Sequence, residues 1–202
     1  VIYNGIDRNI FRPVKAVRNS RDIIFVGNVE DGKKGFVYLL KAMKLLKTEA
    51  RLIVADGSSP HRKISSAFIK SLGLEDRVLF AGSLSHAELV KLYSSCTVAV
   101  VPSTHEGFGF PAAEAMSCGL PVIAADAGAL PEVVGNSGLI VPSRDHEALA
   151  EAIDTLLNDS RLRRKFSREG IERVHKLFSW EHAVKNMTDV YSNLKNNFRS
   201  YV

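Results

Sequence analysis

The sequence predicts an α/β protein built on an open parallel sheet of about six strands, with helices on both faces and more helices at the C-terminal end. Short β-branched runs alternate with longer helical patterns from residue 21 to residue 158. These runs are almost continuously apolar, which is typical of strands covered on both faces. After residue 158 the pattern is helical to the end of the chain.

Six runs have the composition of buried strands. Each is five or six residues long and rich in Val, Ile, Leu and Ala, and each is followed by a segment with turn or helix signals. Strands that alternate with helices in this way are parallel and are joined by right-handed crossovers. The predicted strands are IIFVG (23–27), RLIVA (51–55), RVLFAG (77–82), TVAVV (97–101), PVIAA (121–125) and GLIVP (138–142).

Helices are predicted from apolar spacing of three and four residues and from capping signals. Ser85 and Glu88 have the spacing of a capping box, and Asp145 and Ser179 are N-cap residues for later helices. Phe178 and Trp180 are expected to anchor the last helix in the core. The predicted helices cover residues 34–46, 85–93, 111–119, 146–157, 160–176 and 180–194.

Composition excludes several classes of protein. The chain has 202 residues and a net charge of +5, but its basic residues form no stripe with interleaved aromatics, so no nucleic-acid partner is expected. Cys96 and Cys118 have no metal-ligand spacing and lie in apolar surroundings, which indicates reduced thiols and a cytoplasmic setting. Without an Asp-x-Asp pair or a His/Cys cluster, we expect neither a bound metal nor another cofactor.

The stretch VPSTHEGFGFPAAE (101–114) contains the candidate ligand-binding residues. It follows a predicted strand, and in an open parallel sheet ligands bind beyond the carboxyl ends of the strands. Gly107 and Gly109 allow close approach to backbone N–H groups, and a helix that starts at Pro111 favours an anion such as a diphosphate. Glu106 and Glu114 would accept hydrogen bonds from flanking hydroxyls. These features suit a nucleotide-sugar; the alternative is a tight turn followed by a solvated helix.

The residues PSTHEGFGFPAAEAMSCGLPV (102–122) contain a glutamate, seven residues and a second glutamate. With this motif the chain resembles the C-terminal half of the retaining glycosyltransferases of family 4, the group 1 transferases of the GT-B fold. The likeness covers nearly the whole chain in order. Its other pieces are IYNGID (2–7), FVG with KG (25–35), VLFAGSLSHAELVKLY (78–93), GALPEVV (128–134) and GLIVP (138–142).

The resemblance implies roles for individual residues. Glu106 would contact the hydroxyls of the donor sugar, and Lys34 would bind the diphosphate; these two are the expected catalytic residues. Glu114 would bind the ribose. Further donor-binding residues would be Lys33, a weaker candidate than Lys34, the backbone of Gly107, Phe108 and Gly109, and the backbone of Gly82, Ser83 and Leu84, which would contact the base.

One position departs from the family pattern. Members usually carry arginine after FVG to pair with the diphosphate, and this sequence has Asn28 there. Asparagine offers two neutral donors where arginine offers five in a charged fork, so donor affinity would be lower unless Lys33 compensates.

The resemblance also implies the domain organisation, one half of a GT-B fold. Residues 1–20 would be an interdomain connecting segment and residues 21–202 the Rossmann-like nucleotide-sugar-binding domain, with the N-terminal acceptor domain missing. The expected activity is metal-independent, retaining transfer of a sugar from a nucleotide-sugar to an acceptor hydroxyl, and this chain alone would bind the donor with poor turnover or none. A non-catalytic binding module and a GT-B epimerase or hydrolase are the alternatives.

Partners follow from the same expectation. The donor is a nucleotide-sugar with GDP, UDP or ADP, and the acceptor is a glycan or a lipid-linked sugar. The predicted helix at 160–176 is rich in Arg and Lys, with Glu169 and Glu172 interspersed, which favours a solvated face. Weak association of the full-length protein with the inner face of a membrane is the alternative.

Overall fold

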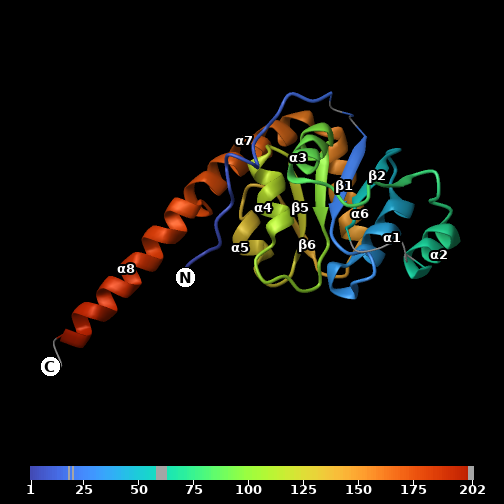
Figure 1. Cartoon of the computed structure of the whole chain (residues 1–202). Helices are drawn as coiled ribbons and strands as arrows, with labels where there is room; N and C mark the ends of the chain where they lie inside the picture. The colour runs from blue at the N-terminus through green and yellow to red at the C-terminus, as the bar shows by residue number, and fades with distance from the viewer. Residues whose placement is uncertain (18, 20, 58–62, 200–202) are drawn as a thin grey trace.

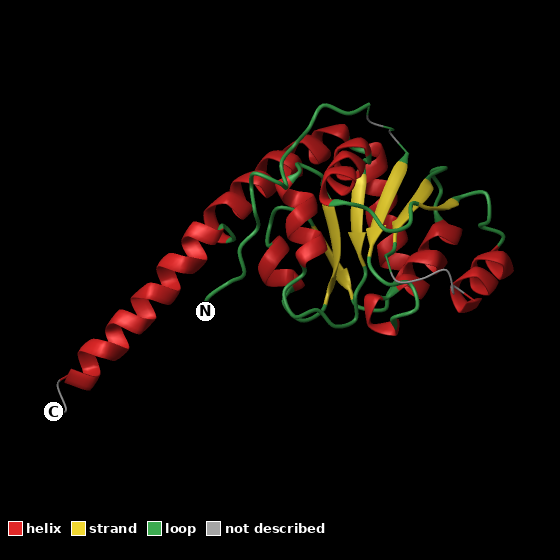
Figure 2. Ribbon diagram, viewed as in Figure 1, coloured by secondary structure: helices red, strands yellow, loops and turns green. Residues whose placement is uncertain are grey.

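The structure is a computed structural model that describes residues 1–17, 19, 21–57 and 63–199. Within these residues, six parallel strands form one open sheet in the order β3–β2–β1–β4–β5–β6 (Figure 1). Figure 2 shows helices on both sides of the strands, so the predicted Rossmann-like α/β fold is confirmed. The strands are β1 (Asp22–Val26), β2 (Arg51–Ala55), β3 (Val78–Phe80), β4 (Val98–Val101), β5 (Val122–Asp126) and β6 (Leu139–Pro142).

Each of the first five strands is followed by a helix that returns the chain to the start of the next strand, as parallel pairing requires. After β1 a short 3-10 helix, η1 (Gly32–Lys34), precedes α1. The helices are α1 (Phe36–Leu45), α2 (Lys63–Leu72), α3 (His86–Ser95), α4 (Phe110–Ser117), α5 (Leu130–Val134), α6 (His146–Asn158), α7 (Ser160–Leu177) and α8 (Trp180–Arg199).

Two hydrophobic cores lie on opposite faces of the sheet. Ile23 and Phe25 of β1 face the core that contains α1, α2 and α6, whereas Ile24 faces the core that contains α3, α4 and α5. This division explains why the strands are apolar at every position rather than at alternate ones. Burial of one such Ile or Phe side chain contributes about 1.5–3 kcal/mol.

The last two helices continue beyond the sheet. α7 spans both cores, because Phe166 packs in the first and Val174 in the second, while α8 extends away from the body of the molecule (Figure 1). Phe178 is fully buried, as predicted. The expectation for Trp180 was wrong: it is 55% exposed, because its ring lies at the surface over Gly5, where a Cβ would overlap it.

The predicted caps are confirmed. Ser85 and Glu88 form a complete capping box, Asp145 accepts two N–H bonds at the start of α6, and Ser179 accepts from His182. The predicted helix at 34–46 is interrupted, because Gly35 has a left-handed conformation (φ 69°) between η1 and α1. Helices α2 and α5 were not predicted, and α5 is only five residues long.

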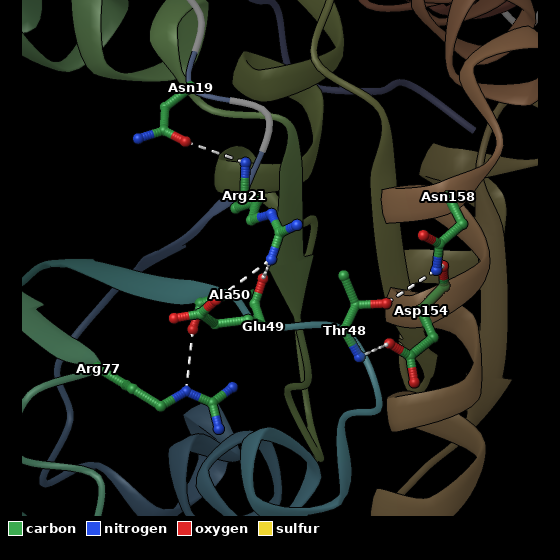
Figure 3. A network of polar contacts seen from close by, with 8 residues as sticks. All are labelled: Asn19, Arg21, Thr48, Glu49, Ala50, Arg77, Asp154 and Asn158. Carbon is green, nitrogen blue, oxygen red and sulfur yellow. Dashed lines mark hydrogen bonds and ion pairs between the residues drawn. The ribbon is translucent and has the colours of Figure 1, made fainter.

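A polar network closes the edge of the sheet where the strands begin (Figure 3). Arg21 reaches Glu49, and Arg77 donates through Nε to the carbonyl of Ala50 at 3.0 Å. Asp154 of α6 accepts from the N–H of Thr48 at 2.9 Å, just before β2. These contacts anchor α6 and the strand starts, which leaves the opposite edge for the loops that follow the strands.

Candidate functional site

The strand order reverses between β1 and β4, which marks the switch point of the sheet. In open α/β sheets the chain leaves adjacent strands on opposite sides at this point, so a crevice forms beyond their carboxyl ends. The loop after β1 covers residues 27–35 and the loop after β4 covers residues 102–109. Helices α1 and α4 therefore both begin at this crevice.

The two loops are joined through their backbones. The N–H of Thr104 donates to the carbonyl of Lys33 at 2.8 Å. Gly35 lies so close to Pro102 that a Cβ would overlap the carbonyl oxygen of that residue, and its φ of 69° also favours glycine. The glycine of the KG pair is therefore required where the loops meet, a role that its place in the sequence did not reveal.

This junction brings the two predicted catalytic side chains together. The Nζ of Lys34 lies 2.9 Å from Oε2 of Glu106, and the side chains are only 27% and 13% exposed. Ser103, which is buried, donates through Oγ to the same carboxylate oxygen at 3.3 Å. A partly buried pair is screened less than a surface pair. Ser103 lies inside the motif at 102–122 but was not predicted to be a site residue.

The turn after β5 contacts the backbone of Glu106. The N–H of Ala129 donates to the carbonyl of Glu106 at 3.0 Å. Gly128 has a φ of 55°, and a Cβ there would overlap the same carbonyl oxygen. Three strand ends, those of β1, β4 and β5, thus fix the position of this glutamate.

The glycine loop differs in part from the prediction. Gly109 has a positive φ of 98°, whereas Gly107 does not, and a Cβ at Gly107 would have no neighbour within 4 Å. Gly107 therefore faces open space. The side chain of Phe108 is buried against Phe178, so only its backbone is available to a ligand.

Helix α4 starts one residue before the predicted position, at Phe110, which makes Glu114 its fifth residue. Its N-cap is Gly109, and no side chain caps the first turn. The N-cap of α1, Gly35, likewise has no side-chain hydrogen bond to its helix. The N-terminal amides of two helices are thus left without side-chain caps at the crevice, where an anion would be stabilised.

Glu114 is held from α3. Its Oε2 accepts a hydrogen bond of 3.2 Å from the hydroxyl of Tyr93, a side chain that is 1% exposed. Burial raises the pKa of Glu114, while the Tyr93 hydrogen bond and the nearby His86 act in the opposite direction. Burial also raises the pKa of Tyr93 well above its ordinary value, so the phenol remains a donor.

The remaining predicted residues lie in the loops after β1 and β3. The Oδ1 of Asn28 accepts from the N–H of Glu30 at 2.8 Å, so this side chain stabilises its own loop. Lys33 is exposed and joins the site through its carbonyl only. Gly82, with a φ of 75°, and Ser83 lie in the loop after β3, and the side chain of Ser83 lies near Gly57, two residues after β2. Leu84 is half-buried there.

A separate apolar hollow of about 260 Å³ lies between α1 and α2 and is lined by residues including Val29, Phe36 and Phe68. It is close to the loop after β1, but none of its lining residues is Lys34, Glu106 or Glu114.

In the part of the chain that the structure describes, no group of three or more His, Cys, Asp or Glu side chains could hold a metal. Among the same residues, no helix is both long and apolar enough to span a bilayer.

Known proteins that are similar to this chain are glycosyltransferases. A family model described as "Glycosyl transferases group 1" matches residues 7–173. The MMP alpha-(1->4)-mannosyltransferase of Mycolicibacterium hassiacum is 35% identical over 201 residues, which cover 95% of this chain and 47% of that protein. The chain spans about half the length of the curated relatives it matches.

Solved structures agree with this assignment. Sucrose-phosphate synthase of Thermosynechococcus elongatus superimposes with a TM-score of 0.88 at 34% identity, over 97% of this chain and 52% of that one. HepE of Anabaena, solved in complex with UDP and glucose, has a TM-score of 0.83 at 24% identity, over 96% and 56% of the two chains, and so shows the same fold. The chain belongs to the group 1 family of glycosyl transferases.

Proposed function

We propose that this chain is the donor-binding half of a retaining glycosyltransferase, which moves a sugar from a nucleotide-sugar to an acceptor hydroxyl without a bound metal. The observation that carries the proposal is the Lys34–Glu106 pair at the switch point, beside the N-termini of α1 and α4. The UDP bound by the structural neighbour HepE supports a nucleotide as the donor's leaving group.

Charge stabilisation of the departing diphosphate is the first task of this site. Lys34 supplies a positive charge, and the first N–H groups of α1 and the N–H of Phe110 in α4 supply backbone donors, because Pro111 has no N–H and Ala112 donates to Gly109. The two helices also direct the positive ends of their dipoles at the site. Preorganised donors of this kind stabilise developing negative charge without reorganisation during the reaction. They would take the role that a metal ion has in sites where Mg²⁺ stabilises a departing diphosphate.

Positioning of the sugar is the second task. Glu106 can accept hydrogen bonds from sugar hydroxyls, and it is fixed by Lys34, Ser103 and Ala129. The ammonium of Lys34 has three N–H donors, so it can keep its bond to Glu106 and still reach a phosphate oxygen. The pair would therefore link the sugar end of the donor to the diphosphate end.

The nucleoside would occupy the other side of the crevice. Glu114, one turn into α4, would accept hydrogen bonds from the ribose hydroxyls, and the backbone of residues 82–84 would contact the base. The acceptor site would lie mostly in an N-terminal domain outside this chain, as in the family that the sequence resembles.

Titration calorimetry of the 202-residue chain with UDP, GDP and ADP tests the proposal. At least one of them should bind, and Lys34→Met should weaken that binding by about 10- to 100-fold, the value of a charged hydrogen bond. Lys41→Met is the matched control, because Lys41 is an exposed lysine on α1. The proposal is wrong if none of the three nucleotides gives a measurable heat, or if the two variants lose the same affinity.

A further inference from the structure

We propose that Tyr93 is a positioning residue of the site: it fixes the carboxylate of Glu114 for the two hydroxyls of the ribose. The inference rests on the proposed function and adds to it a residue that has no contact with the donor itself. Tyr93 lies in α3, whereas Glu114 lies in α4, so the hydroxyl links two elements.

The geometry shows that the hydroxyl of Tyr93 is directed at α4. It lies 3.2 Å from Oε2 of Glu114 and 3.5 Å from the carbonyl oxygen of Pro111. A phenol has one proton to donate. The carboxylate of Glu114 is the nearer of the two acceptors and, because it is charged, the stronger one. The ring is 1% exposed and belongs to the core on this face of the sheet. The hydroxyl is therefore a fixed donor whose direction is set by core packing.

The contact leaves the outer part of Glu114 available. The residue as a whole is partly exposed, and only Oε2 has a hydrogen bond to Tyr93. A carboxylate has about four acceptor positions on its two oxygens. A ligand with two adjacent hydroxyls can therefore donate to Glu114 while Tyr93 keeps its own bond.

The surroundings of Glu114 show what the hydroxyl contributes. Burial raises the pKa of Glu114, which favours the neutral acid. The hydrogen bond from Tyr93 and the electrostatic effect of His86, both on α3, favour the carboxylate instead. Burial raises the pKa of Cys118, which follows α4, to about 12. Removal of the Tyr93 hydroxyl should raise the pKa of Glu114 further. It should therefore weaken ribose binding, which needs Glu114 as a hydrogen-bond acceptor.

A change of Tyr93 to phenylalanine separates positioning from packing, since the ring that fills the core is kept. We would compare wild type, Tyr93→Phe and the control Tyr191→Phe, whose side chain is 65% exposed on α8. The probes are whichever of UDP, GDP and ADP binds wild type most tightly, and its 2′,3′-dideoxy analogue, which lacks both ribose hydroxyls. Titration of the Glu114 side-chain carboxyl by ¹³C NMR in the ligand-free chain gives an independent readout.

The expected result is a loss of about 3- to 10-fold in affinity for the ribonucleotide in Tyr93→Phe, the range for one lost hydrogen bond. Affinity for the dideoxy analogue should not change, and the midpoint of the Glu114 titration should rise. Tyr191→Phe should match wild type throughout.

Two results overturn the inference. Equal affinity of wild type and Tyr93→Phe for the ribonucleotide would show that the hydroxyl has no part in ribose binding. An equal loss for both probes would show that Tyr93 only supports the fold. Failure of the proposed function is a different outcome, because then wild type itself binds none of the three nucleotides.

Discussion

Replacement of Gly35 by alanine tests the junction of the two site loops. Gly35 has a φ of 69°, and an added Cβ would overlap the carbonyl oxygen of Pro102. The left-handed conformation costs about 1–2 kcal/mol for a residue with a Cβ, and the overlap with backbone adds about 1–3 kcal/mol. The free energy of unfolding should therefore fall by about 2–5 kcal/mol. Because the junction places Lys34 beside Glu106, nucleotide binding should weaken as well.

Gly73→Ala is the matched control. Gly73 has nearly the same φ, 65°, but a Cβ there would have no neighbour within 4 Å. Both variants change the unfolded chain in the same way, so the difference between them isolates the overlap with Pro102. Urea unfolding followed by circular dichroism measures both, and the comparison requires equal m-values. If Gly35→Ala is no less stable than Gly73→Ala, the loops do not meet as described.

Three more predictions concern the supporting structure. Ser85→Ala removes the capping box of α3 and should lower the free energy of unfolding by about 1 kcal/mol in urea titrations, with no change in m. Burial alone would raise the pKa of Asp154, but hydrogen bonds from the N–H groups of Lys47 and Thr48 outweigh it, and the net shift is downward. Asp154 therefore stabilises the fold above its ordinary pKa of 3.8, and the stability difference between wild type and Asp154→Ala should shrink as pH falls through the lower, folded-state value. Burial, with a smaller effect of Glu114, raises the pKa of Cys118 to about 12, and Cys96 is also buried. Neither thiol of the native chain should therefore react with Ellman's reagent at pH 8, whereas both should react in denaturant. Rapid reaction of the native protein would contradict the burial of the two thiols.

The sheet was well predicted because its signal is local. Each strand is a short apolar run, and the structure places every predicted strand within about two residues of its expected bounds. The strand order was not predictable in the same way, because pairing joins segments far apart in the chain, such as β1 and β4. The switch point, which locates the crevice, depends on that pairing.

Helix α5 and Gly35 show two physical limits of the sequence. A helix of five residues has too few positions to display a period, so α5 was seen only as part of a motif. Gly35 was likewise seen as part of the KG pair, because the need for glycine arises from Pro102, a neighbour in space only.

The site residues divide along the same line. Glu106 and Glu114 were identified from the motif and Lys34 from the KG piece of the resemblance, but neither showed that Lys34 pairs with Glu106 across 72 positions. Tyr93 and Ser103 were not predicted, because in the sequence Tyr93 resembles any buried helix residue and Ser103 any loop residue. Only the direction of each hydroxyl in the structure distinguishes them from such residues.

Nuclear magnetic resonance of the ¹⁵N-labelled chain during titration with UDP tests the central claim most directly. Amide shifts should change for residues 27–35 and 107–110, the loop after β1 and the start of α4, and the Nζ of Lys34 should respond with them. Shift changes confined to the apolar hollow between α1 and α2, with the amides of Gly107 and Gly109 unmoved, would contradict a diphosphate site at the switch point of the sheet.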